Sequence, residues 1–206
     1  SHFTATNLHA ELPSYPEKGD KAAANAMLDK AGYKRDSNGV RLKAVLDLIP
    51  DGEDWRRAGE YLKQALGDIG IQLELRYEDV PTWLKRVYHR YDFQMNVNYF
   101  YQLPDPVLGV HRHYGTDQIR KGTHFVNSSR YSNPKLDALL DSGAGEPDAA
   151  KRTAAYKEIQ QILADDMPVV NLFELEFLVV YNTKLKGAYG SAMGAYGSFR
   201  EAYLDD

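Results

Sequence analysis

The sequence predicts an α/β fold in which a mixed β-sheet is flanked by helices. Two strand patterns, Leu42 to Ile49 and residues 71–77, enclose the clearest helical pattern, residues 54–70. In that helix apolar side chains recur at three- and four-residue intervals, at Trp55, Ala58, Leu62, Ala65 and Ile69. The second strand alternates, with Ile71, Leu73, Leu75 and Tyr77 on one side. Strand, helix and strand joined by short loops form a βαβ unit, so we expect parallel strands and a right-handed crossover.

Composition restricts the class of protein. The chain has 206 residues, of which 43% are hydrophobic, which is enough for a packed core. The net charge of -4, with acids and bases mixed along the chain, argues against a nucleic-acid-binding protein. The absence of cysteine excludes disulfides, thiolate metal sites and cysteine nucleophiles. Fifteen tyrosines suit a binding surface better than a dry core.

The remaining first-half elements follow from local patterns. Residues 1–16 read as an extended entry segment, and residues 17–33 read as a helix that Gly32 caps at its C-terminus. A short helix is expected from Pro81, carrying Trp83, Leu84 and Val87. Residues 92–100 alternate as a strand, with Phe93, Met95, Val97 and Tyr99 on one side and Gln94, Asn96 and Asn98 on the other, where they could face water.

The second half predicts more helix than sheet. Asn133 is placed to cap a helix with Pro134 at its first position, and residues 143–147 read as a linker. A long helix is expected over residues 148–165, and residues 167–182 give one or two strands. The pentapeptide GAYGS occurs at 187 and again at 194, and we expect it to line a loop or hairpin.

Six segments, in this order, carry a family resemblance: KAAANAMLDKAGY, AGEYLKQALGDIGIQLEL, YDFQMNVNYF, PDP, YSNPKLDALLD and KRTAAYKEIQQILADDMPVVNLF. Together they make the chain similar to the C-terminal lobe of the family 5 extracellular solute-binding proteins. These are the dipeptide- and oligopeptide-binding subunits of bacterial ABC importers. The resemblance covers nearly the whole chain.

The resemblance implies a fold and a role. Residues 1–206 would form a single C-terminal lobe of a class II periplasmic-binding-protein-like fold, a fragment of a larger two-lobe protein. The expected partners are a peptide or small-molecule ligand, the missing N-terminal lobe and a membrane permease, with no nucleic acid. We expect a periplasmic protein, or an extracellular membrane-anchored one, that is monomeric, is not an enzyme and has no cofactor. The first residues, Ser1-His2-Phe3-Thr4, show no signal peptide and no initiator Met, so we expect a processed or excised chain.

The resemblance also points to candidate ligand-binding residues. Ligands of open α/β sheets collect beyond the carboxyl ends of strands, where Tyr99 and Phe100 are expected. In peptide-binding relatives an aromatic residue at this strand end flanks the ligand, and an aspartate three residues later pairs with the peptide's amino terminus. An acidic-proline pair follows, which Asp105-Pro106 matches. Counting back without gaps puts Tyr99 at the aromatic position and Gln102 at the aspartate position.

Glutamine at position 102 departs from the family pattern. A carboxylate facing an ammonium group contributes about 1.5–3 kcal/mol, and glutamine lacks that charge. The hypothesis is a ligand with no free α-amino group held at this point, such as a sugar, an opine, a blocked peptide or a metal chelate. Two alternatives stay open: a loop insertion would move Asp105 into the anchoring role, or Asp105 shapes a turn and Tyr99 faces the core.

Other polar and aromatic residues have two interpretations each. Trp83 could line the cleft or pack under its helix, and Arg112 could pair with an acidic ligand group or lie on the surface. His111 and His113 would share one face of a strand, with His124 not far along the chain, but we expect no metal site. Trp55 is expected in the core.

The sequence leaves two other classes of function to consider, a hydrolase and an interaction module. A hydrolase could pair Asp105 with Asp117, but the sequence has no nucleophile elbow, phosphate loop or zincin helix. An interaction module would need a large exposed apolar patch.

Overall fold

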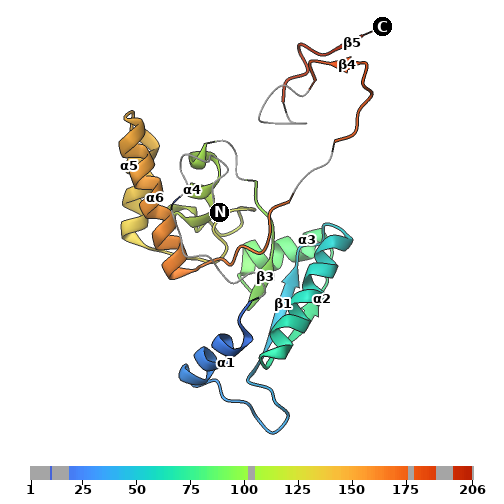
Figure 1. Cartoon of the computed structure of the whole chain (residues 1–206), viewed down its shortest axis with the longest axis vertical. Coiled ribbons are helices and arrows are strands. Elements are labelled where there is room, and N and C mark those ends of the chain that lie inside the picture. Colours follow the sequence, from blue (N-terminus) through green and yellow to red (C-terminus); the bar gives the residue numbers. More distant parts are fainter. Residues whose placement is uncertain (1–9, 11–18, 102–104, 176–178, 189–196, 206) are drawn as a thin grey trace. The chain divides into compact units, whose positions relative to one another are not determined.

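The computed structural model describes residues 10, 19–101, 105–175, 179–188 and 197–205. The chain divides into two compact units (Figure 1). The first, here called the sheet unit, comprises Glu11–Phe100 and Asp117–Arg130. The second, the helical unit, comprises Ser1–Ala10, Tyr101–Thr116 and Tyr131–Asp206.

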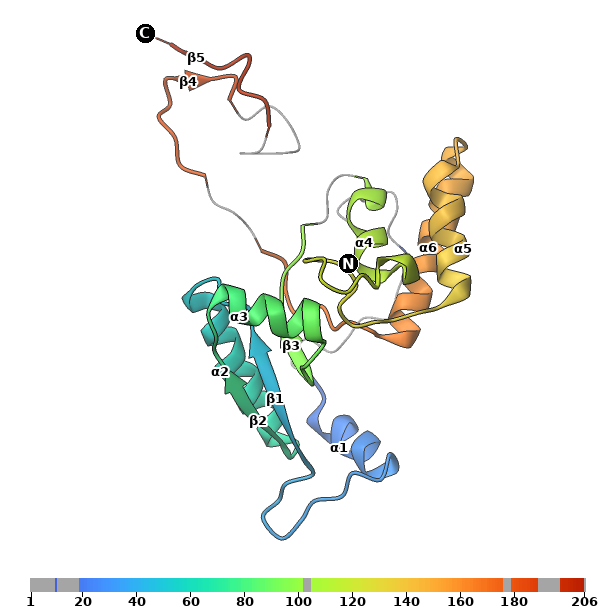
Figure 2. The same ribbon diagram turned by 180° about the vertical axis from the view of Figure 1, so that it is seen from behind.

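The sheet unit is built on three parallel strands. β1 (Leu42–Leu48) lies between β2 (Ile71–Arg76) and β3 (Met95–Val97), and both pairs are parallel. α2 (Glu53–Asp68) connects β1 to β2 and covers one face of the sheet (Figure 2). The predicted βαβ unit and α/β class are therefore confirmed, although the strands described in this sheet pair only in parallel, where a mixed sheet was expected.

The core of the sheet unit gathers side chains from every layer. Trp55 of α2 is buried, as predicted, and Val126 reaches the core from the connection at 117–130. The buried cluster comprises Leu46, Leu48, Ile49, Trp55, Leu73, Trp83, Val87, Tyr88, Val97 and Val126. Tyr77, which the alternation placed on the same side as Leu73, lies just beyond the end of β2 and is 39% exposed.

Helices at either end of the sheet unit begin and end at recognisable residues. α1 (Lys21–Lys30) is capped by the Asp20 side chain, and Gly32 follows it with a φ of 89° that favours glycine. The predicted helix near Pro81 is α3 (Val80–Leu84), which continues as the π-helical segment η2 (Lys85–Arg90). The predicted strand over 92–100 is shorter than expected and contains only β3.

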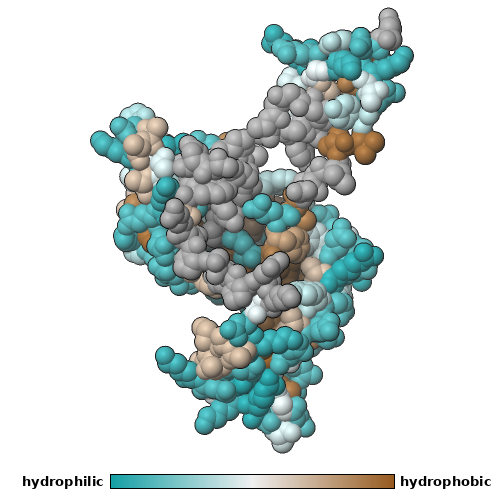
Figure 3. All heavy atoms as spheres, in the orientation of Figure 1, coloured by the Kyte–Doolittle hydropathy of each residue, from teal (hydrophilic) through white to brown (hydrophobic). Residues whose placement is uncertain are grey.

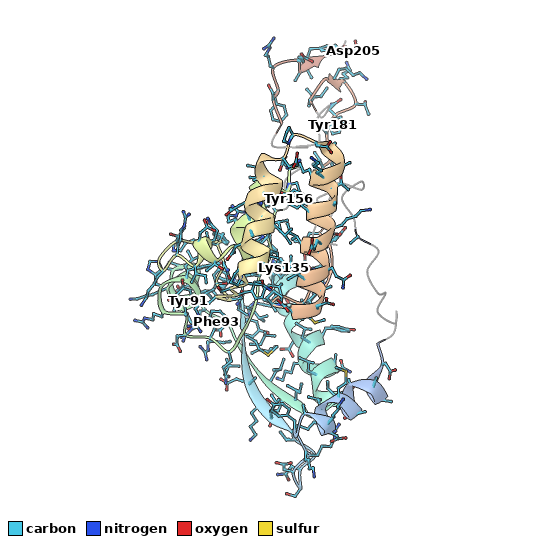
Figure 4. The ribbon with its side chains drawn as sticks, turned by 90° about the vertical axis from the view of Figure 1, so that its left-hand side faces the viewer. Tyr91, Phe93, Lys135, Tyr156, Tyr181 and Asp205 are labelled. Atoms are coloured by element: carbon cyan, nitrogen blue, oxygen red, sulfur yellow. The ribbon has the colours of Figure 1, made fainter. Side chains whose placement is uncertain are left out.

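The helical unit rests on a pair of long helices. α5 (Pro134–Gly145) and α6 (Ala149–Asp166) lie side by side (Figure 4). Asn133 caps α5 through its side chain and Pro134 is the first helical residue, as predicted. The short elements are η3 (Pro106–Leu108), α4 (Val110–Tyr114), η4 (Thr116–Gln118), β4 (Leu185–Lys186) and β5 (Tyr203–Leu204). The buried cluster of this unit comprises Val110, Tyr114, Leu136, Leu140, Tyr156, Ile159 and Leu163.

Three predictions for the second half are wrong. The expected linker at residues 143–147 is helical over its first three residues, because α5 continues to Gly145. His111 and His113 lie on helix α4, where residues two apart do not share a face, instead of on a strand. The described residues between 167 and 182 form no strand, because no neighbouring strand pairs with them in the described part of the chain. Large apolar side chains there stay exposed, up to 96% at Val180, and brown hydrophobic atoms mark the C-terminal segment in Figure 3.

Other predictions fall on residues outside the described part. These are nearly all of the entry segment 1–16, residue 102, and most of the GAYGS repeat.

Candidate functional site

An aromatic stack lies beyond the carboxyl ends of two neighbouring strands. Trp55 stands in the first turn of α2, which begins shortly after β1, and Tyr99 follows β3 by two residues. Their rings stack with centroids 5.2 Å apart and planes 12° from parallel. Tyr99 is half-buried and packs against the core of the sheet unit, so part of its surface has the core-facing role considered from the sequence. The stack fixes where the chain leaves the sheet.

The amide side chains of Gln94 and Asn98 hold β3 and the residues that follow it in place. Asn98 donates from Nδ2 to the hydroxyl oxygen of Tyr88 at 2.7 Å and accepts from the backbone N–H of Tyr99 at 2.8 Å. Gln94 accepts from the backbone N–H of Val45 at 2.7 Å. The interpretation that these amides simply face water therefore missed their role, which is to fix the strand and its exit.

Asp105 is engaged by its own unit. One of its oxygens accepts from the backbone N–H of Val107 at 2.9 Å and thereby caps η3. Nη2 of Arg152 contacts both carboxylate oxygens, at 2.8 and 2.9 Å. Burial raises the pKa of Asp105, but the Val107 N–H and Arg152 outweigh it and hold that pKa below the usual value. The structure therefore favours the alternative in which Asp105 shapes a turn, and disfavours a ligand anchor at this carboxylate.

Arg152 was not singled out from the sequence. Its Nε donates to the carbonyl oxygen of Gly143 at 3.1 Å, and its guanidinium lies 5.3 Å from the centre of the Tyr156 ring. Tyr156 is fully buried, and its hydroxyl lies 3.2 Å from Nε2 of His111. Arg152 thus joins the start of α6 to η3 and to the end of α5. Nothing in the local pattern of residues 148–165 marks position 152 as different from any other charged helix position.

Two other predicted site residues have different outcomes. Trp83 is only 1% exposed and packs edge-on against Tyr88 at 5.8 Å, which supports the interpretation in which it packs under its helix. Arg112 lies half-buried on α4, and its Nε is buried without a hydrogen-bond partner in the described structure. Phe100 is half-buried after the aromatic stack, and Gln102 lies outside the described residues.

A shallow concavity of about 640 Å³ lies in the helical unit, at the turn between α5 and α6. Its wall carries the charges of Asp105 and Arg152, which neutralise each other, and the exposed side chain of Leu108. The lining residues are Asp105, Val107, Leu108, Ala144, Gly145, Glu146, Pro147, Ala149 and Arg152. Glu146 adds a third charge to this wall, and its Oε1 accepts from the backbone N–H of Asp148 at 2.9 Å.

Within the described ranges, no group of three or more histidine, aspartate or glutamate side chains is arranged to hold a metal ion. No helix in the described part of the chain is both long enough and apolar enough to cross a membrane.

Comparison with known protein families identifies the chain. The model of "Bacterial extracellular solute-binding proteins, family 5 Middle" matches residues 3–120, more than half of the sequence. The chain belongs to this family. Its members bind solutes and are not enzymes, which confirms the prediction of a non-enzymatic protein.

Curated relatives agree with this assignment. Protein XP55 of Streptomyces lividans is 29% identical over 172 residues, which cover 82% of this chain and 31% of the relative. The probable D,D-dipeptide-binding periplasmic protein DdpA of Escherichia coli is 27% identical over 170 residues, with the same coverage of 82% and 31%. This family 5 chain therefore spans about a third of the length of these relatives.

Solved structures share the fold. The periplasmic binding protein DppA of Helicobacter pylori, in complex with the peptide STSA, superposes with a TM-score of 0.66 at 20% identity and covers 91% of this chain and 35% of its own. A Thermotoga maritima oligopeptide-binding protein with bound mannohexaose gives 0.65 at 24% identity, covering 75% and 31%. NikZ of Campylobacter jejuni with Ni(L-His) gives 0.65 at 16% identity, covering 73% and 31%. These likenesses concern the fold.

Proposed function

We propose that this chain is the C-terminal ligand-binding lobe of a two-lobe solute-binding protein that delivers a peptide or peptide-like solute to an ABC-transporter permease. Family membership supports the binding role, and the dipeptide specificity in the name of the E. coli relative supports the class of solute. The chain spans about a third of such relatives, which supports a larger whole protein. The family description supports a location in the periplasm or at the cell surface.

A second lobe also accounts for the exposed apolar segment of the helical unit. Val170, Leu172 and Val180 are between 45% and 96% exposed, although a run of this composition is normally buried. Exposed apolar surface of this kind marks a place where another part of a protein packs. The missing lobe is the occupant that the family resemblance suggests.

The proposal about how the ligand is held depends on the contacts that Asp105 already makes. Among the described residues from Tyr99 to Val107, Asp105 is the one carboxylate, and it is held by Arg152 and by the backbone of its own turn. The position that would anchor a peptide's amino terminus is Gln102. The proposed ligand is therefore peptide-like but is not held through a free α-amino group by this segment.

Matched ligands test this proposal. The two-lobe protein containing this chain is titrated calorimetrically with short peptides and with the same peptides acetylated at the amino terminus. Since a charge-assisted bond of about 1.5–3 kcal/mol corresponds to about 10- to 150-fold in affinity, its absence means that acetylation changes Kd by less than about threefold. Acetylation that weakens every bound peptide by about tenfold or more contradicts the proposal.

A gain-of-function variant makes the same test sharper. Gln102→Asp introduces the absent carboxylate, so we expect it to tighten binding of free peptides by about tenfold or more and to leave acetylated peptides unaffected. Gln102→Ala is the matched control, and it should leave the preference between the two ligand sets unchanged.

A non-peptide solute is the second candidate. The folds shared with the mannohexaose-bound Thermotoga protein and with NikZ bound to Ni(L-His) favour it. An oligosaccharide, an opine and a nickel chelate belong in the same titration. Saturable binding of one of these, with no response to any peptide, selects this candidate over the first.

A further inference from the structure

A pair of histidines lies in the sheet unit, apart from the aromatic stack. His89 comes from the π-helical segment η2, and His124 comes from the connection at 117–130. Their Nε2 atoms are 2.9 Å apart, and the ring centres are separated by 5.1 Å. Both side chains are exposed, so the pair is open to solvent and to small solutes.

The two backbone segments that carry these histidines are held together by a hydrogen bond and by packing. The backbone N–H of Gly122 donates to the carbonyl oxygen of Tyr88 at 2.8 Å, which ties the connection to η2. Tyr88 is fully buried, and its ring lies 5.8 Å from that of His124 and 5.7 Å from that of Phe125. The two imidazoles are therefore brought together by packing of the unit, because the segments that carry them are held in place.

Irregular backbone occurs on both sides of the pair. η2 is π-helical, and such segments are frequent at functional sites. Tyr91, just after η2, and Phe125, next to His124, have φ angles of 53° and 57°. Left-handed conformations are unfavourable for non-glycine residues and cluster where a binding geometry is held in place. The fold thus maintains an unfavourable backbone at the two segments that present the histidines.

The 2.9 Å between the two Nε2 atoms is a hydrogen-bond distance, and the same spacing also fits two nitrogen ligands of one metal ion. Metal–imidazole bonds of about 2.0–2.1 Å place two nitrogens about 2.9 Å apart at a right angle and about 3.4 Å apart at a tetrahedral angle. Right-angle positions belong to square-planar and octahedral ions, among which Ni²⁺ and Cu²⁺ favour imidazole. Because both side chains are exposed, small rotations can turn the two lone pairs towards one point.

We propose that His89 and His124 form a two-histidine site for Ni²⁺ or Cu²⁺, whose other coordination positions are filled by water or a small chelator. No third protein donor is grouped with them in the described structure, so the site is open on its outer side. The proposal is independent of the solute proposed for the two-lobe protein.

Titration of this chain with NiCl₂ and CuCl₂ alone, in a non-coordinating buffer, tests the site. His2 and His9 near the amino terminus could also bind these ions, so every sample carries His2→Gln and His9→Gln. We expect one saturable site, lost in His89→Gln and also in His124→Gln. His111→Gln is the matched control, since it removes one histidine of the helical unit and should leave metal binding unchanged.

The spectrum of bound Cu²⁺ gives a second readout. Electron paramagnetic resonance should show two equatorial imidazole nitrogens in the parent and one, or no bound ion, in each single variant. Circular dichroism melting establishes that both variants fold, as expected for exposed side chains. Three results overturn the proposal: no saturable binding by the parent, unchanged binding in both variants, or an equal loss in His111→Gln.

Discussion

In each unit one arginine connects separate segments through ion pairs: Arg86 in the sheet unit and Arg152 in the helical unit. The two arginines differ in how deeply their acidic partners are buried. Arg86 of the sheet unit holds Glu78 through two nitrogens, at 2.6 and 2.9 Å, and contacts Asp92 at 2.7 Å. Arg152 of the helical unit contacts Asp105 through one nitrogen only. Both arginines connect segments that are separate in the sequence, so their ion-pair distances alone do not distinguish them.

The difference is the buried carboxylate of Asp47. Its side chain is 1% exposed, its oxygens have no hydrogen-bond partner among the described residues, and it relies on Arg76 at 3.4 Å and Arg86 at 3.6 Å. Burial raises the pKa of Asp47 in spite of these two arginines, whereas the pKa of the 45% exposed Asp105 is lowered. An arginine beside a buried charge should therefore matter far more than one beside a charge that water can reach.

Arg86→Ala should give the largest effect. It leaves Asp47 buried with Arg76, at 3.4 Å, as its remaining counter-charge, and loss of one partner of a buried pair costs about 3–5 kcal/mol. Arg152→Ala should cost less than about 2 kcal/mol, because water can solvate Asp105. Both tryptophans, Trp55 and Trp83, lie in the sheet unit, so urea unfolding followed by tryptophan fluorescence reports the first variant. Far-UV circular dichroism, to which α5 and α6 contribute, reports the second. Equal losses would remove the contrast between the units.

Neutralising the buried carboxylate provides the control. Asp47→Asn in the Arg86→Ala background should restore more than half of the lost free energy of unfolding. Alone, Asp47→Asn should stabilise the protein near neutral pH, since the raised pKa of Asp47 means that its charged form disfavours folding. That advantage should shrink as the pH falls below the folded-state pKa, and it should be gone below the unfolded-state pKa of about 4, where Asp47 is protonated in both states. Destabilisation by Asp47→Asn at neutral pH would mean that the arginines more than offset its burial.

Two glycines, Gly59 in α2 and Gly143 in α5, allow the apolar packing of the two units to be compared. A Cβ at Gly59 of α2 would lie 2.4 Å from Cδ1 of Leu48, which is fully buried, so Gly59→Ala should cost about 1–3 kcal/mol. A Cβ at Gly143 of α5 would lie 3.3 Å from the Tyr156 ring, so strain and the gain in helix propensity of about 1 kcal/mol should nearly cancel. Gly67→Ala is the control: nothing lies within 4 Å, and it should stabilise α2 by about 0.5 kcal/mol. Urea midpoints rank the three, and a Gly143→Ala loss as large as that of Gly59→Ala would contradict the ranking.

The elements that the sequence predicted correctly are those fixed by local chemistry. The three- and four-residue spacing from Trp55 determined α2, and Asn133 with Pro134 determined the start of α5. The missed strand at 167–182 shows the limit of such patterns. An apolar run becomes a strand only when another strand supplies its hydrogen bonds, and nothing local states whether one is present.

The candidate site was harder to predict because its residues acquire their roles from distant partners. The place of Tyr99 at a strand end was within reach of the sequence, since it depends on a local pattern. The role of Asp105 depends on Arg152, 47 residues further on, and the pairing of His89 with His124 spans 35 residues. Spacing along the chain contains no information about such pairs, and Trp83 fits a core or a cleft equally well until its neighbours are known.

Asp105 gives the smallest expected effect and the closest link to function. Asp105→Asn keeps an oxygen that can cap η3 but loses the charge beside Arg152, and at 45% exposure we expect a loss of about 1 kcal/mol or less. Asp105→Ala also loses the cap and should cost about 1 kcal/mol more. Because the pKa of Asp105 is lowered on folding, the advantage of wild type over Asp105→Asn is present above the unfolded-state pKa of about 4 and is lost as the pH falls through the folded-state pKa.

Thermal melting between about pH 2 and pH 7, followed by circular dichroism, shows how that advantage changes as the pH falls below the unfolded-state pKa. The same two variants in the two-lobe protein separate structure from ligand contact. If Asp105 only shapes its turn, ligand affinity should fall no more than the stability of the unit accounts for, and it should fall further in Asp105→Ala than in Asp105→Asn. A variant that melts like wild type but no longer binds ligand would instead place this carboxylate at the ligand, and the equivalence of position 102 with the family's anchoring aspartate would then have to be abandoned.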